Sequence, residues 1–169
     1  EDYCWNKVVH RIDVKVDHFN KLSPAAFVCF PKGGKTSALS VCFDRLKKEG
    51  VNPILISLNS ALQFHEAEDH AQILLRMITA AILGISPDKV TTSASAETLN
   101  SYFQGHKVVL LIDDLHCLGQ SIDATGASLL LEEFLYPAGR YLVFSCLHPV
   151  GIRGIASDPN WCLADRPWE

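Results

Sequence analysis

The chain has 169 residues, of which 48% are hydrophobic and 20% are charged, so its composition is that of a folded domain and not of a disordered segment. Its formal net charge is -4, with 15 basic against 19 acidic side chains, which does not indicate a nucleic-acid-binding protein. No apolar run reaches the roughly 18 to 20 residues that a membrane-spanning helix needs, and no secretory signal is visible.

The two ends of the chain and its cysteines predict whether it is part of a larger protein and in which compartment it lies. Because the chain begins at Glu1 and both ends look cut, we expect a part of a larger, multidomain protein in the cytoplasm or nucleus. A secreted effector whose signal has been removed is the alternative. The cysteines form no Cys-x-x-Cys pair, and several lie inside apolar runs, which predicts buried thiols in a reducing compartment and not disulfides or zinc ligands. They are Cys4, Cys29, Cys42, Cys117, Cys146 and Cys162.

In chain order, short apolar runs alternate with stretches of helical periodicity. Residues 1–24 form a leading segment, in which residues 8–16 alternate loosely and could form an edge strand. Further strands are predicted at residues 25–30, 54–58, 108–112 and 141–145, and helices at 36–49, 68–83, 97–103 and 129–135. A polar loop is expected at 87–95, and residues 148–169 form an irregular, truncated C-terminal segment.

This alternation predicts the fold class. Strands that alternate with helices indicate an α/β domain with a mostly parallel sheet, here over residues 25–147. The runs at 108–112 and 141–144 are apolar almost throughout, as expected for strands that are buried on both faces. We therefore expect a three-layer α/β/α domain.

The strongest motif follows the first core strand. Residues 29–36 read Cys-Phe-Pro-Lys-Gly-Gly-Lys-Thr and approximate the phosphate-binding loop G-x-x-x-x-G-K-[ST], which joins a strand to a helix. The last three residues match, whereas Cys29 replaces the first glycine and puts affinity in doubt. The predicted nucleotide-contacting residues are Pro31, Lys32, Gly33, Gly34, Lys35, Thr36 and Ser37.

The chemistry of such a loop explains these residue types. Backbone N–H groups in a tight glycine turn converge on anionic oxygens, and the helix N-terminus adds partial positive charge. Lys35 would reach the β- and γ-phosphates, and Thr36 would offer its hydroxyl oxygen to Mg²⁺. The alternative interpretation is a glycine turn that only begins a helix, with Lys35 solvated.

Two acids end the most apolar strand. Asp113 is expected to hold Mg²⁺ through a water, and Asp114 lies where many ATPases carry a glutamate that orients the attacking water. Since aspartate is one methylene shorter, Asp114 could still support hydrolysis, support it slowly, or only sense nucleotide. The alternative interpretation of both acids is a turn or a helix N-cap.

The last predicted strand ends in Ser145, which could contact the γ-phosphate or the attacking water, or could simply terminate the strand. Four other side chains are of types that can take part in catalysis, but in such positions they are more often structural or surface residues. They are His116, His148, Arg153 and Arg166.

Taken together, residues 34–36, the Asp113-Asp114 strand end and Ser145 resemble P-loop NTPases of the ASCE division, which includes AAA+ and STAND ATPases. That resemblance implies the strand order 5-1-4-3-2. Residues 29–36 with residues 134–137 and 140–145 look more particularly like the NTPase domains of Crinkler-type and retrotransposon-hot-spot-type proteins. This second resemblance implies an effector or nuclear protein with further domains.

The expected function is binding of ATP with Mg²⁺, with slow hydrolysis or use as a switch. ATP is favoured over GTP because the chain has no N-K-x-D run. Two alternatives remain open, a degenerate P-loop scaffold that mediates interactions and a small P-loop kinase. The expected partners are the nucleotide and either other proteins or the missing domains of the same chain.

Overall fold

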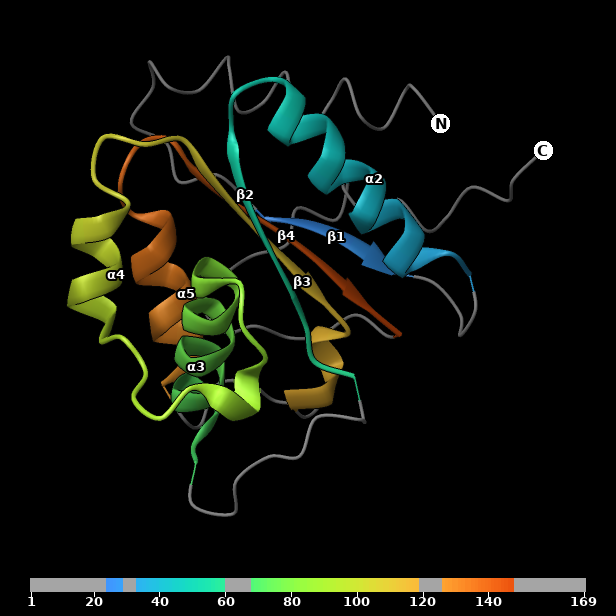
Figure 1. Cartoon of the computed structure of the whole chain (residues 1–169). Coiled ribbons are helices and arrows are strands. Elements are labelled where there is room, and N and C mark those ends of the chain that lie inside the picture. Colours follow the sequence, from blue (N-terminus) through green and yellow to red (C-terminus); the bar gives the residue numbers. More distant parts are fainter. Residues whose placement is uncertain (1–23, 29–32, 60–67, 119–125, 148–169) are drawn as a thin grey trace.

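The computed structural model describes residues 24–28, 33–59, 68–118 and 126–147. The expected edge strand at 8–16 and the C-terminal segment at 148–169 lie outside these residues. Within them, a sheet carries helices on both faces (Figure 1). The α/β class is therefore confirmed.

The sheet is formed by four strands in the order β1-β4-β3-β2, and each neighbouring pair is parallel. The strands are β1 (Ala25–Val28), β2 (Asn52–Ser57), β3 (Val108–Asp113) and β4 (Arg140–Cys146). The last strand in the sequence thus lies between the first and the third, so the carboxyl ends of β1, β4 and β3 meet at one edge. A fifth strand beside β1 is not among the described residues, and the full order 5-1-4-3-2 stays a prediction.

The two central strands explain the continuous apolar runs in the sequence. Every residue of β3 and β4 is buried, because helices cover both faces of the sheet. In β3, successive side chains point to opposite faces, and they enter two separate clusters. Val108, Leu110 and Ile112 pack in one cluster, and Val109 and Leu111 pack in the other.

The helices form the two outer layers of the predicted three-layer arrangement (Figure 1). On one face lies α2 (Lys35–Lys48), whose Leu39, Cys42 and Leu46 pack against the sheet. The other face is covered by α3 (His70–Leu83), α4 (Ala96–Tyr102) and α5 (Ala127–Leu135).

The structure moves some predicted boundaries for local reasons. The helix predicted from residue 68 begins at His70, because Asp69 is its N-cap and forms a capping box with Gln72. The loop at 87–95 contains a short 3-10 helix, η1 (Pro87–Lys89), and a second one, η2 (Leu115–Leu118), follows β3. Pro53 lies within β2, the edge strand of the described sheet, where a missing N–H is tolerated.

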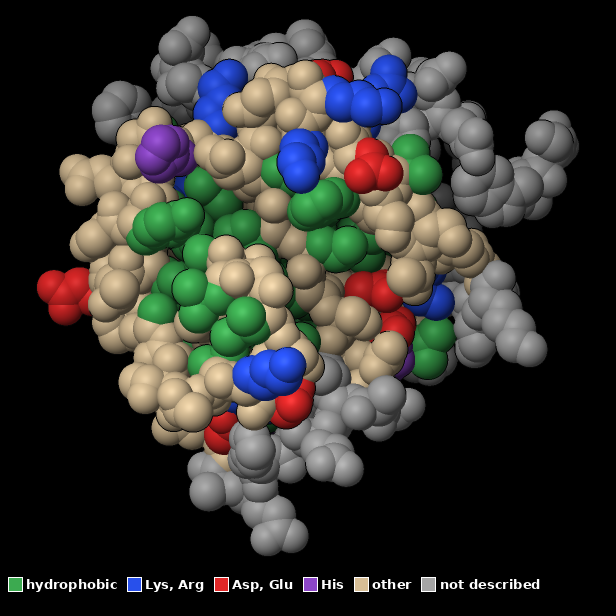
Figure 2. Space-filling view, viewed as in Figure 1, with side chains coloured by type: hydrophobic (Ala, Val, Ile, Leu, Met, Phe, Trp, Pro, Cys, Tyr) green, Lys and Arg blue, Asp and Glu red, His purple; other side chains and the backbone are tan. Residues whose placement is uncertain are grey.

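No one sign of charge dominates the face that Figure 2 shows. On the face in Figure 2, Lys and Arg side chains are spread among acidic and neutral ones, and hydrophobic side chains show over the layer of α3, α4 and α5. No helix in the described ranges has the length and apolar character needed to cross a membrane. Of the cysteines, Cys42, Cys117 and Cys146 are described, and all three are free thiols.

Candidate functional site

The site begins at the turn that leads into α2. Gly34 precedes the helix with a φ of 78°, in the left-handed region that side chains with a Cβ rarely adopt. A Cβ added at Gly34 would meet nothing within 4 Å, so the backbone conformation and not crowding requires a glycine. Its carbonyl oxygen accepts a hydrogen bond of 2.9 Å from the Ala38 N–H, which joins the turn to the first helical bond. The motif residues Cys29, Pro31 and Lys32 lie outside the described residues.

Three further motif residues form the first turn of α2. Lys35 is the first residue of the helix and is only 8% exposed, whereas Thr36 and Ser37 are exposed. No side chain caps the helix start, and no acidic residue lies in its first turn. The N-terminal end of α2 therefore keeps its partial positive charge available to an anion.

One hydrogen bond joins this turn to the end of β3. The Thr36 hydroxyl donates to Asp113 Oδ2 over 2.7 Å, although the two residues are 77 positions apart in the chain. Asp113 is 3% exposed and is the last residue of β3. Its backbone oxygen accepts a 2.9 Å hydrogen bond from the Leu58 N–H, which fixes the end of the strand. The two predicted metal ligands are thus brought together.

Ser145 holds the other carboxylate oxygen of Asp113. It is fully buried on β4, pairs with Phe27 of β1 in register, and donates from Oγ to Asp113 Oδ1 over 2.5 Å. The same Oγ accepts a 2.8 Å hydrogen bond from the Asp114 N–H. Since a hydroxyl has one proton, the Ser145 donor is used on Asp113 in this arrangement.

Asp114 forms the turn after β3 and not a part of the strand. Its φ of 57° makes it the single non-glycine residue with positive φ among the described residues. Aspartate tolerates this conformation better than most residues. Its carbonyl oxygen accepts from the Cys117 N–H over 2.9 Å and so starts η2, and its Oδ1 lies 3.9 Å from His116 Nδ1. The backbone of Asp114 therefore forms a turn, as the alternative interpretation of this acid predicts. Its side chain is partly exposed.

The carboxylates at this edge of the sheet affect the pKa of a nearby thiol, that of Cys117. Burial raises the pKa of Cys117, and the negative charges of Asp114 and Asp113 raise it further. Cys117 is therefore a protonated, weakly reactive thiol at neutral pH. The effect indicates that both carboxylates contribute to a local negative potential.

The donor set fits Mg²⁺ only with help from other ligands. Among the described residues, no group of three or more His, Cys, Asp or Glu side chains could hold a metal ion by itself. Mg²⁺, however, is usually bound by one or two carboxylates together with waters and substrate phosphates. Octahedral Mg²⁺ with oxygens at about 2.1 Å holds neighbouring oxygens about 3 Å apart. The 2.7 Å between Thr36 Oγ1 and Asp113 Oδ2 is close to that spacing.

The structure thus brings Thr36, Asp113, Ser145 and the Asp114 backbone into one hydrogen-bonded group beside Lys35. His148, Arg153 and Arg166 lie outside the described residues. The sequence did not reveal that Ser145 bonds Asp113, and no local signal could have done so, because the contact depends on the strand order. The left-handed turn at Asp114 was open to prediction from its position just after a strand.

Comparisons with known proteins do not place the chain in a family. No protein-family model matches it, and no curated protein matches it. Among solved structures, the crystal structure of a DNA replication initiation factor is similar to 90% of this chain, with a TM-score of 0.41 and 17% identity. The chain spans 41% of the length of that structure. A likeness at this level does not bear on function.

Proposed function

We propose that the chain binds ATP together with Mg²⁺ at the edge where α2 begins and β3 ends. The observation that carries this proposal is the hydrogen bond between Thr36 and Asp113. It unites a hydroxyl from the start of a helix with a carboxylate from a parallel strand at the oxygen spacing that suits Mg²⁺. Thr36 and Asp113 would hold the metal, which would help to neutralise the charge of the phosphates.

The phosphates would lie over the start of α2. The N–H groups of its first turn and the helix dipole favour an anion there, and Lys35 supplies a full positive charge at the same place. The left-handed conformation at Gly34 forms the turn that leads into this end of the helix. The resemblance to P-loop NTPases assigns the same roles to Lys35 and Thr36.

We propose slow hydrolysis or a switch, and not rapid turnover. Hydrolysis requires water to attack the γ-phosphorus as the bond to ADP breaks, with a base or an orienting group beside the water. Asp114 is the candidate for that group, and its short side chain starts from a backbone turn. Ser145 positions Asp113 and this turn, because its hydroxyl is already engaged with both. Ser145 is therefore assigned as a positioning residue.

Thermal unfolding with and without ATP·Mg²⁺ tests the binding proposal. We expect ATP·Mg²⁺ to raise the melting temperature of the wild type and to leave Lys35→Ala unchanged. Lys48→Ala is the matched control, because Lys48 is an exposed lysine in the last turn of the same helix. It should respond like the wild type.

The outcomes separate the remaining alternatives. No shift in the wild type would support the interaction scaffold and refute the proposal. A shift that persists in Lys35→Ala would place the nucleotide elsewhere. If binding is observed, release of inorganic phosphate without an acceptor supports hydrolysis, whereas phosphate transfer that requires a metabolite supports a kinase. From the resemblance to Crinkler-type proteins, we also propose that the chain is part of a larger protein of that kind.

A further inference from the structure

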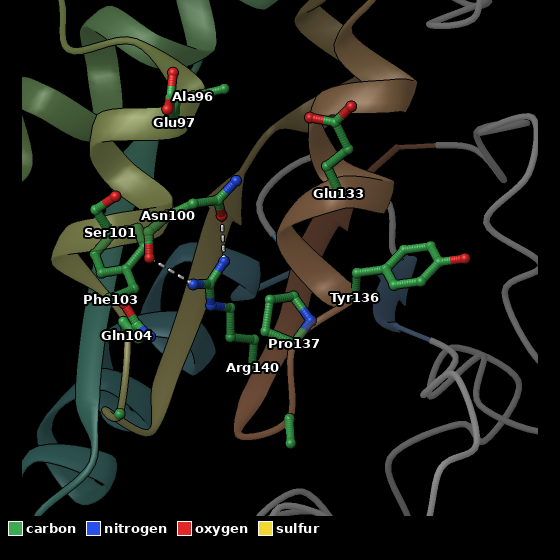
Figure 3. Close-up of a pocket in the computed structure, with 12 residues that line it drawn as sticks. Ala96, Glu97, Asn100, Ser101, Phe103, Gln104, Glu133, Tyr136, Pro137 and Arg140 are labelled. Carbon is green, nitrogen blue, oxygen red and sulfur yellow. Dashed lines mark hydrogen bonds between the residues drawn. The ribbon is translucent and has the colours of Figure 1, made fainter.

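A pocket lies at the opposite edge of the sheet, where β3 and β4 begin. It has a volume of about 770 Å³ and is formed by α4, the end of α5 and the segments before β3 and β4 (Figure 3). This volume is within the range of pockets that hold small organic ligands. Since parallel strands run from this edge to the candidate nucleotide site, the two sites are separated by the length of β4.

Arg140 brings a buried positive charge to this pocket. Its side chain is 4% exposed, and its guanidinium donates to the Asn100 side-chain oxygen and, over 3.0 Å, to the Asn100 backbone oxygen. The guanidinium carbon lies 5.6 Å from the ring centroids of Phe103 and of Phe134. Two aromatic rings and a neutral amide thus surround the charge.

No carboxylate among the described residues forms a salt bridge with Arg140. Burial also lowers the pKa of its guanidinium, because the charged form is partly desolvated. A buried charge without an opposite charge is costly, and such charges in proteins are usually paired. The guanidinium also has more N–H donors than Asn100 accepts. An anionic group of a ligand would supply the opposite charge that the described side chains do not.

The Asn100 amide indicates where that anion would lie. Because its oxygen accepts from Arg140, its NH₂ group points the other way, toward the space between α4 and α5 in Figure 3. Asn100 and Arg140, which both line the pocket, thus each carry donors beyond those used in their mutual hydrogen bonds. A carboxylate is the simplest group that accepts from both.

Two glutamates add the opposite charge to the mouth of the pocket. Glu97 on α4 and Glu133 on α5 line it from facing sides, and both are exposed. A simple anion would be repelled by these carboxylates, and a simple cation would leave Arg140 uncompensated. A ligand that carries a negative and a positive charge close together can pair with Arg140 and with the two glutamates.

We propose that this pocket binds a free amino acid. Its carboxylate is held by Asn100 and Arg140, and its ammonium lies between Glu97 and Glu133. The proposal does not depend on nucleotide binding, since none of these residues belongs to the nucleotide site.

Thermal-shift titration of the whole chain with each standard amino acid tests this site. We expect at least one to raise the melting temperature. Its N-acetyl derivative, which lacks the ammonium, and its carboxamide, which lacks the carboxylate, should each bind about tenfold more weakly or worse. Lys35→Ala should keep the response, which separates this site from the nucleotide site.

Asn100→Asp tests the site most directly, because it places a carboxylate beside Arg140 without changing the shape of the side chain. The ligand-free melting temperature should rise, and the response to the amino acid should disappear. Glu133→Gln should weaken binding by about tenfold, while Glu132→Gln, a neighbour that does not line the pocket, should not. The proposal is overturned if no standard amino acid stabilises the wild type, or if the response survives in Asn100→Asp or with the N-acetyl derivative.

Discussion

The two edges of the sheet can be compared through one buried charged residue at each, Asp113 and Arg140, whose direct neighbours differ in kind. At the carboxyl edge, Asp113 is 3% exposed and accepts from two hydroxyl groups. At the amino edge, Arg140 is 4% exposed and donates to one amide residue. Hydroxyl protons rotate freely, so a cation can replace the Thr36 proton at Asp113 with little movement.

The amide at Arg140 has less freedom, because one guanidinium nitrogen donates to the Asn100 side-chain oxygen and the other donates to the Asn100 backbone oxygen. A ligand there would add to donors that are already aligned. We therefore expect the carboxyl edge to exchange a hydroxyl proton for a cation, and the amino edge to accept a ligand without rearrangement of its donors. Both sites lie on β4, with Ser145 near one end and Arg140 at the other.

Ser145→Ala should have the largest effect on stability and tests the carboxyl edge. The substitution leaves Asp113 Oδ1 and the Asp114 N–H without their buried partner, so the free energy of unfolding should fall by about 2 kcal/mol. Urea denaturation measures this change. Thr91→Ala, at an exposed loop position, should change it by less than about 0.5 kcal/mol. Equal effects of the two substitutions would show that the network does not stabilise this edge.

A matched pair of glycines on α2 separates stability from function. Gly34 and Gly50 flank the two ends of the helix with φ values of 78° and 76°, and a Cβ at either would meet nothing within 4 Å. Replacement by alanine should therefore cost about 1 kcal/mol at both positions, through backbone strain alone.

Nucleotide response should distinguish the two variants. Gly34→Ala should lose most of the stabilisation by ATP·Mg²⁺, because its turn precedes the N–H groups that face the phosphates. Gly50→Ala should keep it. Equal retention by both variants would argue that the turn at Gly34 only begins the helix.

The smallest effect concerns the potential at the carboxyl edge. Because the Asp114 charge contributes to the raised pKa of Cys117, Asp114→Asn should lower that pKa. More thiolate is then present at a fixed pH below the pKa, so alkylation of Cys117 by iodoacetamide should become a few-fold faster. Peptide mass spectrometry follows each thiol separately. Cys42 is an internal control, because burial alone raises its pKa to about 12, and an equal acceleration there would indicate loosening of the fold.

Much of the fold could be predicted from the sequence, because burial on both faces leaves a continuous apolar run. Residues 108–112 show this directly, and Leu39, Cys42 and Leu46 mark the covered side of α2 by their spacing. The positions of Lys35 and Thr36 at a helix start and of Asp113 at a strand end were also predicted, because each follows from a local pattern. Their roles in binding stay predictions. The short helix η2 was missed, because it depends on the turn geometry at Asp114.

Long-range side-chain partners could not be predicted. The bond between Ser145 and Asp113 requires β4 to lie beside β3, and the bond between Arg140 and Asn100 requires α4 to pack near the start of β4. Arg140 before an apolar strand looks like an ordinary boundary residue in the sequence. Only its 4% exposure identifies it as a buried charge.

Calorimetric titration of ATP, with Mg²⁺ and with EDTA, into the wild type and Asp113→Asn tests the central claim most directly. We expect the wild type to bind ATP about tenfold or more tightly with Mg²⁺ than without it, and Asp113→Asn to bind equally in both buffers. A parallel titration with GTP gives the base preference. Absence of ATP binding by the wild type, or binding that does not change with Mg²⁺, would contradict the assignment of Thr36 and Asp113 as the metal site.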